Sequence, residues 1–162
     1  FRSLKMWLDY SRLEAAGNRY IAFDGRKAEC DWSDVARGIC DDRSGVGSDG
    51  IVVAFDSMVA PIRMRVFNSD GSEAEISGNG LRLFLKFCIE NQIVPVPDSA
   101  LEVETMAGVR KVWPTMDADK MIEARIDMGI PSFRPESLPC IATSPEFPHL
   151  SLDLGTEVID VT

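Results

Sequence analysis

A short run of small and polar residues stands directly before the most apolar segment of the chain. Ser77, Gly78, Asn79 and Gly80 precede the segment 81–90, whose sequence is LRLFLKFCIE. Asn79 is a candidate N-cap for a helix that begins here, because Asn side chains accept hydrogen bonds from the free amides of a first turn. The two glycines let a ligand approach the backbone closely. Free N–H groups at the positive end of a helix dipole favour a carboxylate or a phosphate, so the pattern indicates an anion site.

The same residue types also occur where there is no ligand. A glycine-rich cap on an ordinary core helix has this local pattern, and short glycine-rich motifs recur widely. A second glycine-rich stretch, 45–50, lacks the Lys-Ser/Thr pair of a Walker phosphate loop. We expect a tight, structured loop there.

The segment that follows Gly80 is apolar on nearly all sides of a helix. Its apolar residues go round the helix axis and are Leu81, Leu83, Phe84, Leu85, Phe87, Cys88 and Ile89. A helix of this kind is buried on nearly all faces, and this one is too short to span a bilayer. The sequence therefore predicts a central helix wrapped by other elements.

Strand patterns flank this helix on both sides. Apolar runs and period-two alternation predict a hairpin over 11–24 with a turn at Gly17-Asn18, strands over 51–55 and 62–67, a hairpin over 101–112, and strands over 121–128 and 157–162. A second, short helix capped by Asp31 or Ser33 is expected to reach about Cys40. The proline-rich segment 129–150 is expected to be irregular. The prediction is an α+β domain, a mostly antiparallel sheet wrapped around one central helix.

Composition limits the classes of partner. The net charge of −9 and the pI of about 4.6 argue against nucleic acid or an anionic membrane surface as a partner. No apolar run is long enough for a transmembrane helix, and there is no signal-peptide pattern. The four cysteines form no CxxC pair and there is a single histidine, His149, so no metal site is expected. Without a disulfide framework, we expect a reducing, cytoplasmic compartment.

Three stretches carry a resemblance to a known family. Residues 68–82, NSDGSEAEISGNGLR, resemble the first signature of diaminopimelate epimerase, N-A-D-G-S-E-x-x-x-C-G-N-G-x-R, without gaps. Residues 11–24 resemble the opening of that family, T-K-M-H-G-x-G-N-D-F-x-x-x-D. The loop 40–50 resembles its C-D-R-x-x-G-I-G-A-D-G, with one extra Asp. The resemblance is strongest over 11–90 and is weaker to 162.

The resemblance implies a fold, an activity and a set of site residues. The fold is one of two similar domains that each wrap sheet around a central helix, with the active site between them. The activity is a cofactor-independent epimerisation of LL- to meso-diaminopimelate, a precursor of lysine and peptidoglycan, and no cofactor is expected. Two cysteines face opposite sides of the α-carbon, one as thiolate and one as thiol. Asn18, Asn68, Gly78 and Asn79 fall on positions of the substrate-binding motifs.

The departure from the family falls on the catalytic position itself. Ser77 stands where the family carries its first cysteine. A hydroxyl becomes a useful base only with an activating partner, and nothing in the sequence places His149 nearby. Three explanations stay open. Ser77 is an inactivating replacement, or the protein performs a related isomerase reaction of the phenazine-biosynthesis type with Glu73 or Glu75 as base, or it is a non-catalytic carboxylate-binding module. Glu73 and Glu75 are otherwise expected to be solvated turn charges.

The resemblance also gives domain boundaries and partners as expectations. Residues 1–10 do not fit the family pattern and are assigned to an N-terminal extension, and 11–162 to the N-terminal domain, without the second domain. Because the first residue is Phe1, we expect that the native N-terminus is missing from this sequence or was processed. The expected partners are an amino-acid substrate and the second domain, and a homodimer is compatible with the resemblance. A second half with its own Cys-Gly-Thr/Ser motif would favour an enzyme over a binding module.

Overall fold

The computed structural model describes residues 7–132 and 150–161. The chain divides into two compact units, of which the first ends at Met128 and the second begins at Gly129. Within the described ranges, the first unit contains an eight-stranded sheet and two helices, and the second contains a two-stranded sheet. The α+β class expected from the sequence is confirmed.

The large sheet runs in the order β1-β2-β3-β4-β6-β7-β8, with β5 paired to β4. Most neighbours are antiparallel, whereas β2–β3 and β4–β6 are parallel. Parallel neighbours need long crossovers, and each of these two crossovers contains a helix. The strands are β1 (Tyr10–Ala15), β2 (Asn18–Asp24), β3 (Gly50–Phe55), β4 (Ile62–Asn68), β5 (Glu73–Ala74), β6 (Leu101–Thr105), β7 (Gly108–Asp117) and β8 (Lys120–Ile126).

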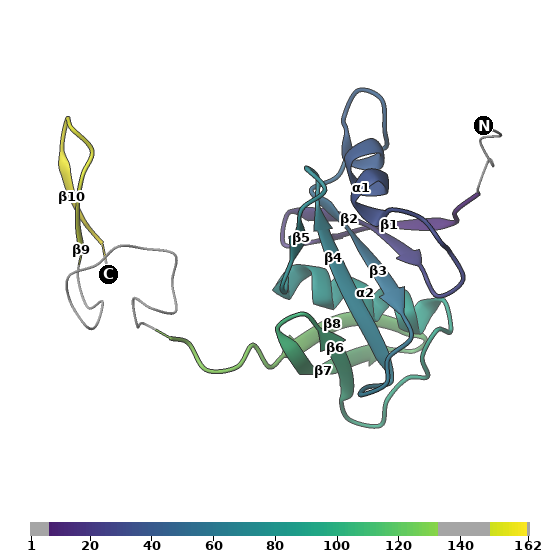
Figure 1. Ribbon diagram of the computed structural model, residues 1–162. Helices are drawn as coiled ribbons and strands as arrows, with labels where there is room; N and C mark the ends of the chain where they lie inside the picture. The colour runs from purple at the N-terminus through teal and green to yellow at the C-terminus, as the bar shows by residue number, and fades with distance from the viewer. Residues whose placement is uncertain (1–6, 133–149, 162) are drawn as a thin grey trace. The chain divides into compact units, whose positions relative to one another are not determined.

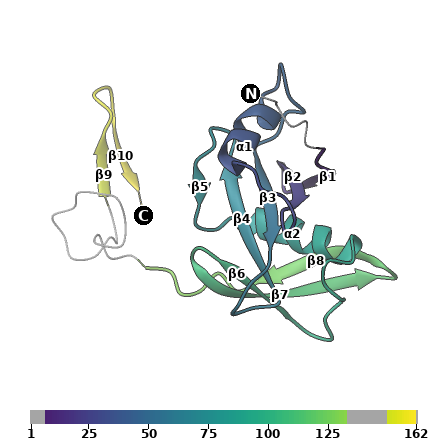
Figure 2. The same cartoon turned by 45° about the vertical axis from the view of Figure 1, so that its right-hand side comes forward.

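Helix α2 (Gly78–Glu90) lies inside the curl of this sheet, as Figures 1 and 2 show. Leu81, Phe84, Leu85 and Cys88 on this helix are completely buried. They belong to a core cluster that also includes side chains from β2, β3, β4, β6, β7 and β8. The prediction of a central helix buried on nearly all faces is confirmed.

The opposite face of the sheet is covered by α1 (Trp32–Cys40). Alternate residues of β3 divide between the two layers, so that Val52 packs in the core around α2 whereas Ile51 and Val53 pack with α1. Because both faces are covered, β3 is a continuous apolar run rather than an alternating one. Of the two candidate caps for this helix, Asp31 is the N-cap: its side chain accepts hydrogen bonds from the amides of residues 33 and 34.

The predicted hairpins over 11–24 and 101–112 are confirmed as β1–β2 and β6–β7, but the turn of the first is Ala16-Gly17 and not Gly17-Asn18, because Asn18 already pairs with Ala15. Two further details differ from expectation. Strand β7 continues past Val112 to Asp117, and Pro114 lies within it opposite Ala124 of β8. The short strand β5 was not predicted, because two residues show no periodicity. No helix of the described residues is long and apolar enough to cross a membrane.

The second unit contains the hairpin of β9 (Leu150–Asp153) and β10 (Val158–Val161). The last strand was predicted, but β9 was not, because its first residue falls in the segment that was expected to be irregular. Gly155 adopts a φ of 80° in the intervening turn, which glycine allows without strain. The remainder of the proline-rich segment, with His149 and Cys140, lies outside the described residues.

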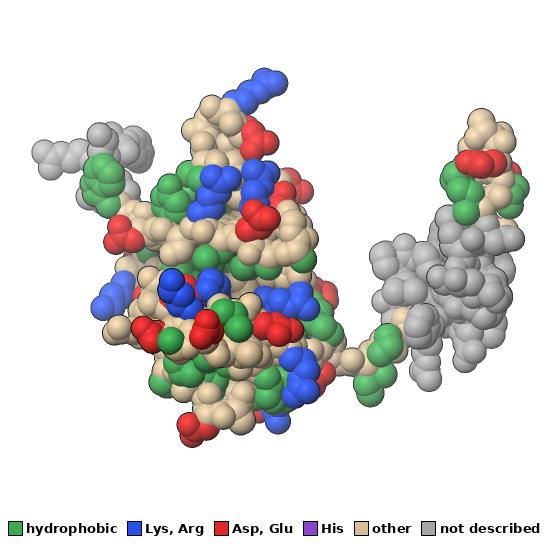
Figure 3. Space-filling model, turned by 180° about the vertical axis from the view of Figure 1, so that it is seen from behind, with side chains coloured by type: hydrophobic (Ala, Val, Ile, Leu, Met, Phe, Trp, Pro, Cys, Tyr) green, Lys and Arg blue, Asp and Glu red, His purple; other side chains and the backbone are tan. Residues whose placement is uncertain are grey.

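Charges of both signs cover the surface of the first unit. Figure 3 shows Lys and Arg side chains interspersed with Asp and Glu on one face. Ion pairs include Arg26 with Asp24 and Lys86 with Glu90. On that face charges of the two signs are therefore mixed rather than separated into patches.

Candidate functional site

The register of the sheet brings the predicted residues to one end of it. Tyr20 in β2 lies opposite Gly50 in β3, and Gly50 lies opposite Asn68 in β4. The beginning of β2, with Asn18, and the end of β4 therefore lie at the same end of the sheet. The chain that leads into α2 lies at this end too, since Ser77 contacts Tyr20. Gly50 is required by the packing: an added Cβ would come within 2.5 Å of the Phe67 carbonyl oxygen and 3.0 Å of the Tyr20 ring.

Ser77, and not Asn79, is the N-cap of α2, so the prediction for Asn79 was wrong. Ser77 is extended, with φ −132° and ψ 120°, and its Oγ accepts a hydrogen bond from the Gly80 amide at 3.0 Å. The spacing explains the correction, since a cap residue precedes the amide that it satisfies by two or three positions. This cap requires glycine at position 80, because a Cβ there would lie 2.9 Å from the Ser77 Cβ.

The hydroxyl of Ser77 has a second neighbour in β2. The phenol oxygen of Tyr20 lies 3.2 Å from the Ser77 Oγ, and the Tyr20 ring is buried. Among the residues that the structure describes, Tyr20 is the only side chain that hydrogen bonds to this hydroxyl. No carboxylate or imidazole in that part of the chain is placed to take its proton, so nothing there activates Ser77 as a base.

Two asparagines predicted for the site contact each other. Asn79 Nδ2 donates to Asn18 Oδ1 at 2.8 Å, and Asn79 Oδ1 accepts from Arg82 Nη1 at 2.5 Å. Arg82 was not predicted as a site residue, although it lies three positions after Asn79, a spacing at which helical side chains meet. Hydrogen bonds therefore join the three side chains in a series, here called the relay, from Asn18 at the start of β2 to Asn79 and Arg82 on α2.

The first two amides of α2 have no partner in the described ranges. The Gly80 amide donates to the Ser77 Oγ and the Leu81 amide to the Ser77 carbonyl oxygen, whereas the amides of Gly78 and Asn79 have no acceptor there. A Cβ added to Gly78 would meet only the Met128 side chain, at 3.6 Å from its sulfur. The protein's own packing therefore does not require glycine at 78, in contrast to Gly80.

Asn68 lies at the same end of the sheet, but its hydrogen bonds are within its own turn. Its Nδ2 donates to the Ser72 Oγ at 2.9 Å, and its amide donates to the Ser72 carbonyl oxygen. Asp70 Oδ1 accepts from the Ser72 amide and hydroxyl, which lowers the pKa of the Asp70 carboxyl. Gly71 has a φ of 85°, a left-handed conformation that glycine adopts in this turn without strain. The contacts of Asn68 are thus within the 68–72 turn, and the structure does not join it to Asn18 or Asn79.

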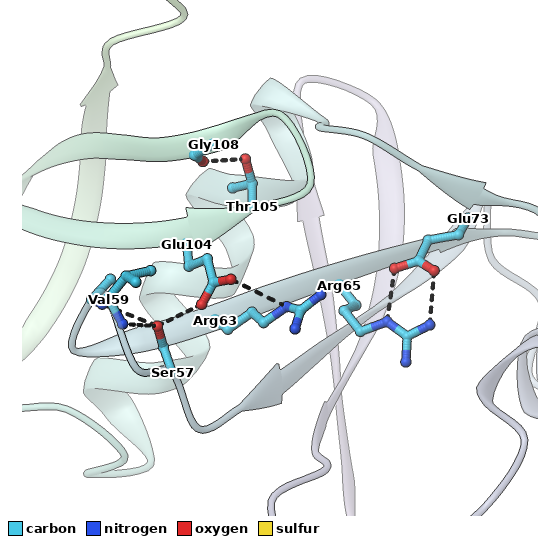
Figure 4. Close-up of polar contacts among 9 residues, drawn as sticks. Ser57, Val59, Arg63, Arg65, Glu73, Glu104, Thr105 and Gly108 are labelled. Carbon is cyan, nitrogen blue, oxygen red and sulfur yellow. Dashed lines mark hydrogen bonds and ion pairs between the residues drawn. The ribbon is translucent and has the colours of Figure 1, made fainter.

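Glu73 is not a solvated turn charge, so that expectation was wrong. Both its oxygens accept from Arg65, at 2.7 Å each, as Figure 4 shows. The Arg65 guanidinium is also stacked over the Phe55 and Phe67 rings. This bidentate pair holds the pKa of the Glu73 carboxyl below its usual range. Glu75 is exposed, as expected.

The described cysteines are not poised as thiolates. Burial raises the pKa of the Cys88 thiol in α2 far above its ordinary value. Burial also raises the pKa of Cys40, whose sulfur accepts from the Ser48 hydroxyl, and that of Cys30. Within residues 7–132 and 150–161, no group of three His, Cys, Asp or Glu side chains could hold a metal ion.

A cavity of about 570 Å³ is lined in part by Arg82. It is lined by the end of β1 (Glu14, Ala15), by α2 (Arg82, Lys86) and by residues 121–124 of β8. The Arg82 Nε donates to the Ala124 carbonyl oxygen at 3.4 Å, and the Lys86 Nζ to that of Met121 at 2.7 Å. Both cations of α2 therefore reach across to the edge strand of the sheet.

Solved structures of low sequence identity share this fold. A probable proline racemase from Agrobacterium radiobacter K84 aligns with a TM-score of 0.62 at 13% identity, over 74% of this chain and 41% of the other. A hydroxyproline epimerase from Agrobacterium vitis aligns with a TM-score of 0.59 at 12% identity, over 74% and 40%. A phenazine biosynthesis protein of the PhzF family from Bacillus anthracis gives 0.54 at 22% identity, over 74% and 38%.

Curated relatives are closer in sequence. The diaminopimelate epimerase of Methanothermobacter thermautotrophicus is 36% identical over 158 residues, which is 94% of this chain and 54% of the relative. That of Bacillus mycoides is 36% identical over 135 residues, 82% of this chain and 46% of the relative. The chain thus spans about half the length of the relatives it matches. The sequence model of the diaminopimelate epimerase family matches residues 12–134, and the chain therefore belongs to this family.

Proposed function

We propose that this chain is the N-terminal half of a diaminopimelate-epimerase-like protein, with an extension over 1–10 and the domain over 11–162. Its site binds the α-carboxylate of diaminopimelate but does not invert the α-carbon. The observation that carries the proposal is the pair of amides of Gly78 and Asn79, which have no acceptor among the described residues and stand beside Ser77 at the positive end of α2. Family membership supports the choice of substrate.

The chemistry explains why these donors matter. An α-proton is a very weak acid, and its removal needs preorganised donors that stabilise the charge developing on the neighbouring carboxylate. The amides of Gly78 and Asn79 supply such donors, and Asn18 stands beside them through its bond to Asn79. No cofactor enters this scheme. Asn68 supports the site through the 68–72 turn rather than through Asn18 or Asn79.

With serine at position 77, this scheme has no base on this half of the protein. In the proposed ancestral reaction a thiolate at this position takes the proton, and the helix dipole lowers the pKa of that thiol. The Ser77 hydroxyl keeps the size of that group, but it is held by the Gly80 amide and Tyr20 and has no activating partner in the described residues. The second acid–base group belongs to the other half of the protein, which we propose completes the cleft.

A phenazine-type isomerase with an acidic base is less well supported. Both carboxylate oxygens of Glu73 accept hydrogen bonds from Arg65, and these bonds lower the pKa of Glu73. A base needs a pKa near the working pH, and this pair moves the pKa of Glu73 away from it. Glu75 is exposed and carries no observation that favours a catalytic role.

Hydrogen exchange at the α-carbon tests the proposal. LL- and meso-diaminopimelate are incubated with the chain in deuterated water, and loss of the α-proton signal is followed by NMR. We expect no exchange above the rate in buffer, whereas the epimerase of M. thermautotrophicus, run in parallel, exchanges the proton. Measurable exchange by this chain would contradict the proposed inactivity.

Binding is tested separately by titrating the labelled chain with meso-diaminopimelate. We expect weak binding, with the amide shifts concentrated at Gly78, Asn79 and Asn18. Gly78→Val is the matched variant, because the protein's own packing tolerates a Cβ there while a ligand at the backbone would meet it. Shifts confined to other regions, or a Gly78→Val variant that binds as well as the wild type, would reject the site.

A further inference from the structure

We propose that Arg82 is a positioning residue of this anion site, because it fixes which way round the Asn79 and Asn18 carboxamides lie. The inference rests on the proposed function. It goes beyond that function by assigning a role to a side chain whose hydrogen bonds are to Asn79 and to β8. The relay runs from Arg82 Nη1 to Asn79 Oδ1, and from Asn79 Nδ2 to Asn18 Oδ1.

The direction of this relay follows from the chemistry of its first member. A guanidinium has five N–H donors and no acceptor, whereas a carboxamide presents an acceptor at one side and a donor at the other. Asn79 must therefore turn its oxygen toward Arg82, which leaves its Nδ2 to face Asn18. Asn18 must then accept this hydrogen bond with its Oδ1. Its own Nδ2 is the group left over, and a donor is what a carboxylate requires.

Without the guanidinium, the relay has no preferred direction. Both carboxamides can rotate together by half a turn, and the Asn18–Asn79 hydrogen bond forms equally well in reverse. In the reversed state Asn18 Nδ2 is consumed and its oxygen is the free group. An oxygen repels a carboxylate, so only the forward orientation, about half of the molecules, would bind the ligand, and the apparent affinity would fall about twofold.

Arg82 is itself held in place by β8. Its Nε donates to the Ala124 carbonyl oxygen at 3.4 Å, so the side chain connects the edge strand of the sheet with the site. Lys86, one turn later, donates to the Met121 carbonyl oxygen in the same strand and to Glu90, and it does not contact the relay. If Arg82 only fastened α2 to β8, the two cations would have equivalent roles. This makes Lys86→Met the matched control for Arg82→Met.

The first experiment uses the ligand-free chain. The side-chain amide signals of Asn18 and Asn79 are assigned from Asn18→Asp and Asn79→Asp, and their exchange with water is measured by NMR. We expect slow exchange of the Asn79 amide in the wild type and in Lys86→Met. In Arg82→Met we expect faster exchange at Asn79 and slower exchange at Asn18, with recovery in Arg82→Lys. Signals that do not respond to Arg82→Met, or that respond equally to Lys86→Met, overturn the inference.

The second experiment titrates the same variants with meso-diaminopimelate. Because about half of the Arg82→Met molecules would hold Asn18 in the reversed orientation, binding should weaken about twofold in this variant, and Lys86→Met should bind as the wild type does. If the wild type binds and Arg82→Met binds equally well, the positioning role is overturned while the proposed function stands. If the wild type does not bind, the proposed function fails, and with it the role of Arg82 toward a ligand, whatever the amide signals show.

Discussion

Ser77 combines a structural role with the place of a catalytic group. Its Oγ caps α2 through the Gly80 amide and lies against the Tyr20 phenol. A serine serves the cap well, whereas a thiol is a weak acceptor in its neutral form. The ionised sulfur is different, because both the amide and the phenol could donate to it. The same surroundings that make Ser77 a good cap would therefore stabilise a thiolate.

Restoring the thiol tests this view of the position. In Ser77→Cys the pKa of the new thiol should fall below the free value of about 8.5, because the helix dipole and two donors favour the charged form. The measurement is the rate of alkylation against pH. The wild-type chain is the control, since it carries the same other cysteines, and the described ones have raised pKa values. A thiol with an ordinary or raised pKa would mean that the helix end does not act on residue 77.

Glu73 gives a pH-dependent prediction at the same scale. Because its pKa is lowered in the folded protein, its pairing with Arg65 stabilises the fold above the pKa of an unfolded glutamate, about 4.3. That stabilisation is lost as the pH falls through the lower, folded value. Glu73→Gln should therefore lower the urea midpoint at pH 7, and its difference from the wild type should shrink below pH 4.

The control for this prediction is Glu75→Gln, two residues away. Glu75 is exposed and forms no ion pair in the described structure. Its midpoint should follow the wild type at every pH. If Glu73→Gln and Glu75→Gln behaved alike at pH 7, the Arg65 pair would contribute nothing measurable to stability.

At the scale of the element, the two glycines that begin α2 have different reasons to be there. A Cβ at residue 80 would collide with the cap, at 2.9 Å from the Ser77 Cβ, whereas a Cβ at residue 78 meets only Met128 in ordinary contact. Gly80 therefore belongs to the helix cap, and Gly78 leaves the backbone open on the side of the proposed ligand.

This difference predicts opposite outcomes for two alanine variants. Gly80→Ala should displace the Ser77 cap and cost about 0.5–2 kcal/mol of unfolding free energy, the usual loss of an N-cap. Gly78→Ala should be neutral or slightly stabilising, because alanine has the higher helix propensity. Urea unfolding measures both. An equal effect of the two substitutions would contradict the distinction.

At the scale of the molecule, the first unit is built around α2. The parallel pairs β2–β3 and β4–β6 carry one helix to each face of the sheet, and the inner helix contributes residues to the larger of the two core clusters. The second cluster lies under α1 and contains the Phe23 and Trp32 rings, 5.4 Å apart. The two faces of one sheet thus contribute side chains to two separate core clusters.

The core role of α2 gives the largest predicted effect on stability. Phe84 is completely buried in this cluster, so Phe84→Ala should cost about 3–5 kcal/mol, a large part of the stability of a small domain. Met58→Ala is the control, since Met58 is 100% exposed. An unchanged urea midpoint in Phe84→Ala would be incompatible with the burial of this helix.

The sequence by itself determined most of the local structure and the family. Helix α2 was predicted because its apolar residues go round the axis, and β3 because a continuous apolar run means two covered faces. The hairpin of β1 and β2 was predicted from turn chemistry to within one residue, since its turn is Ala16-Gly17 rather than Gly17-Asn18. These signals lie in neighbouring residues, so they can be read along the chain. The signature of 68–82 gave the family for the same reason.

Only the tertiary structure decided which side chains act together. Asn18 and Asn79 are 61 positions apart, and Tyr20 and Ser77 are 57 apart, so their contacts depend on how β2 packs against the start of α2. The pairing of Glu73 with Arg65 likewise depends on β4 and the turn that follows it. Local patterns record the types of these residues, but a hydrogen bond depends on distance and direction. Both are fixed by sheet register and helix packing, which bring distant parts of the chain together.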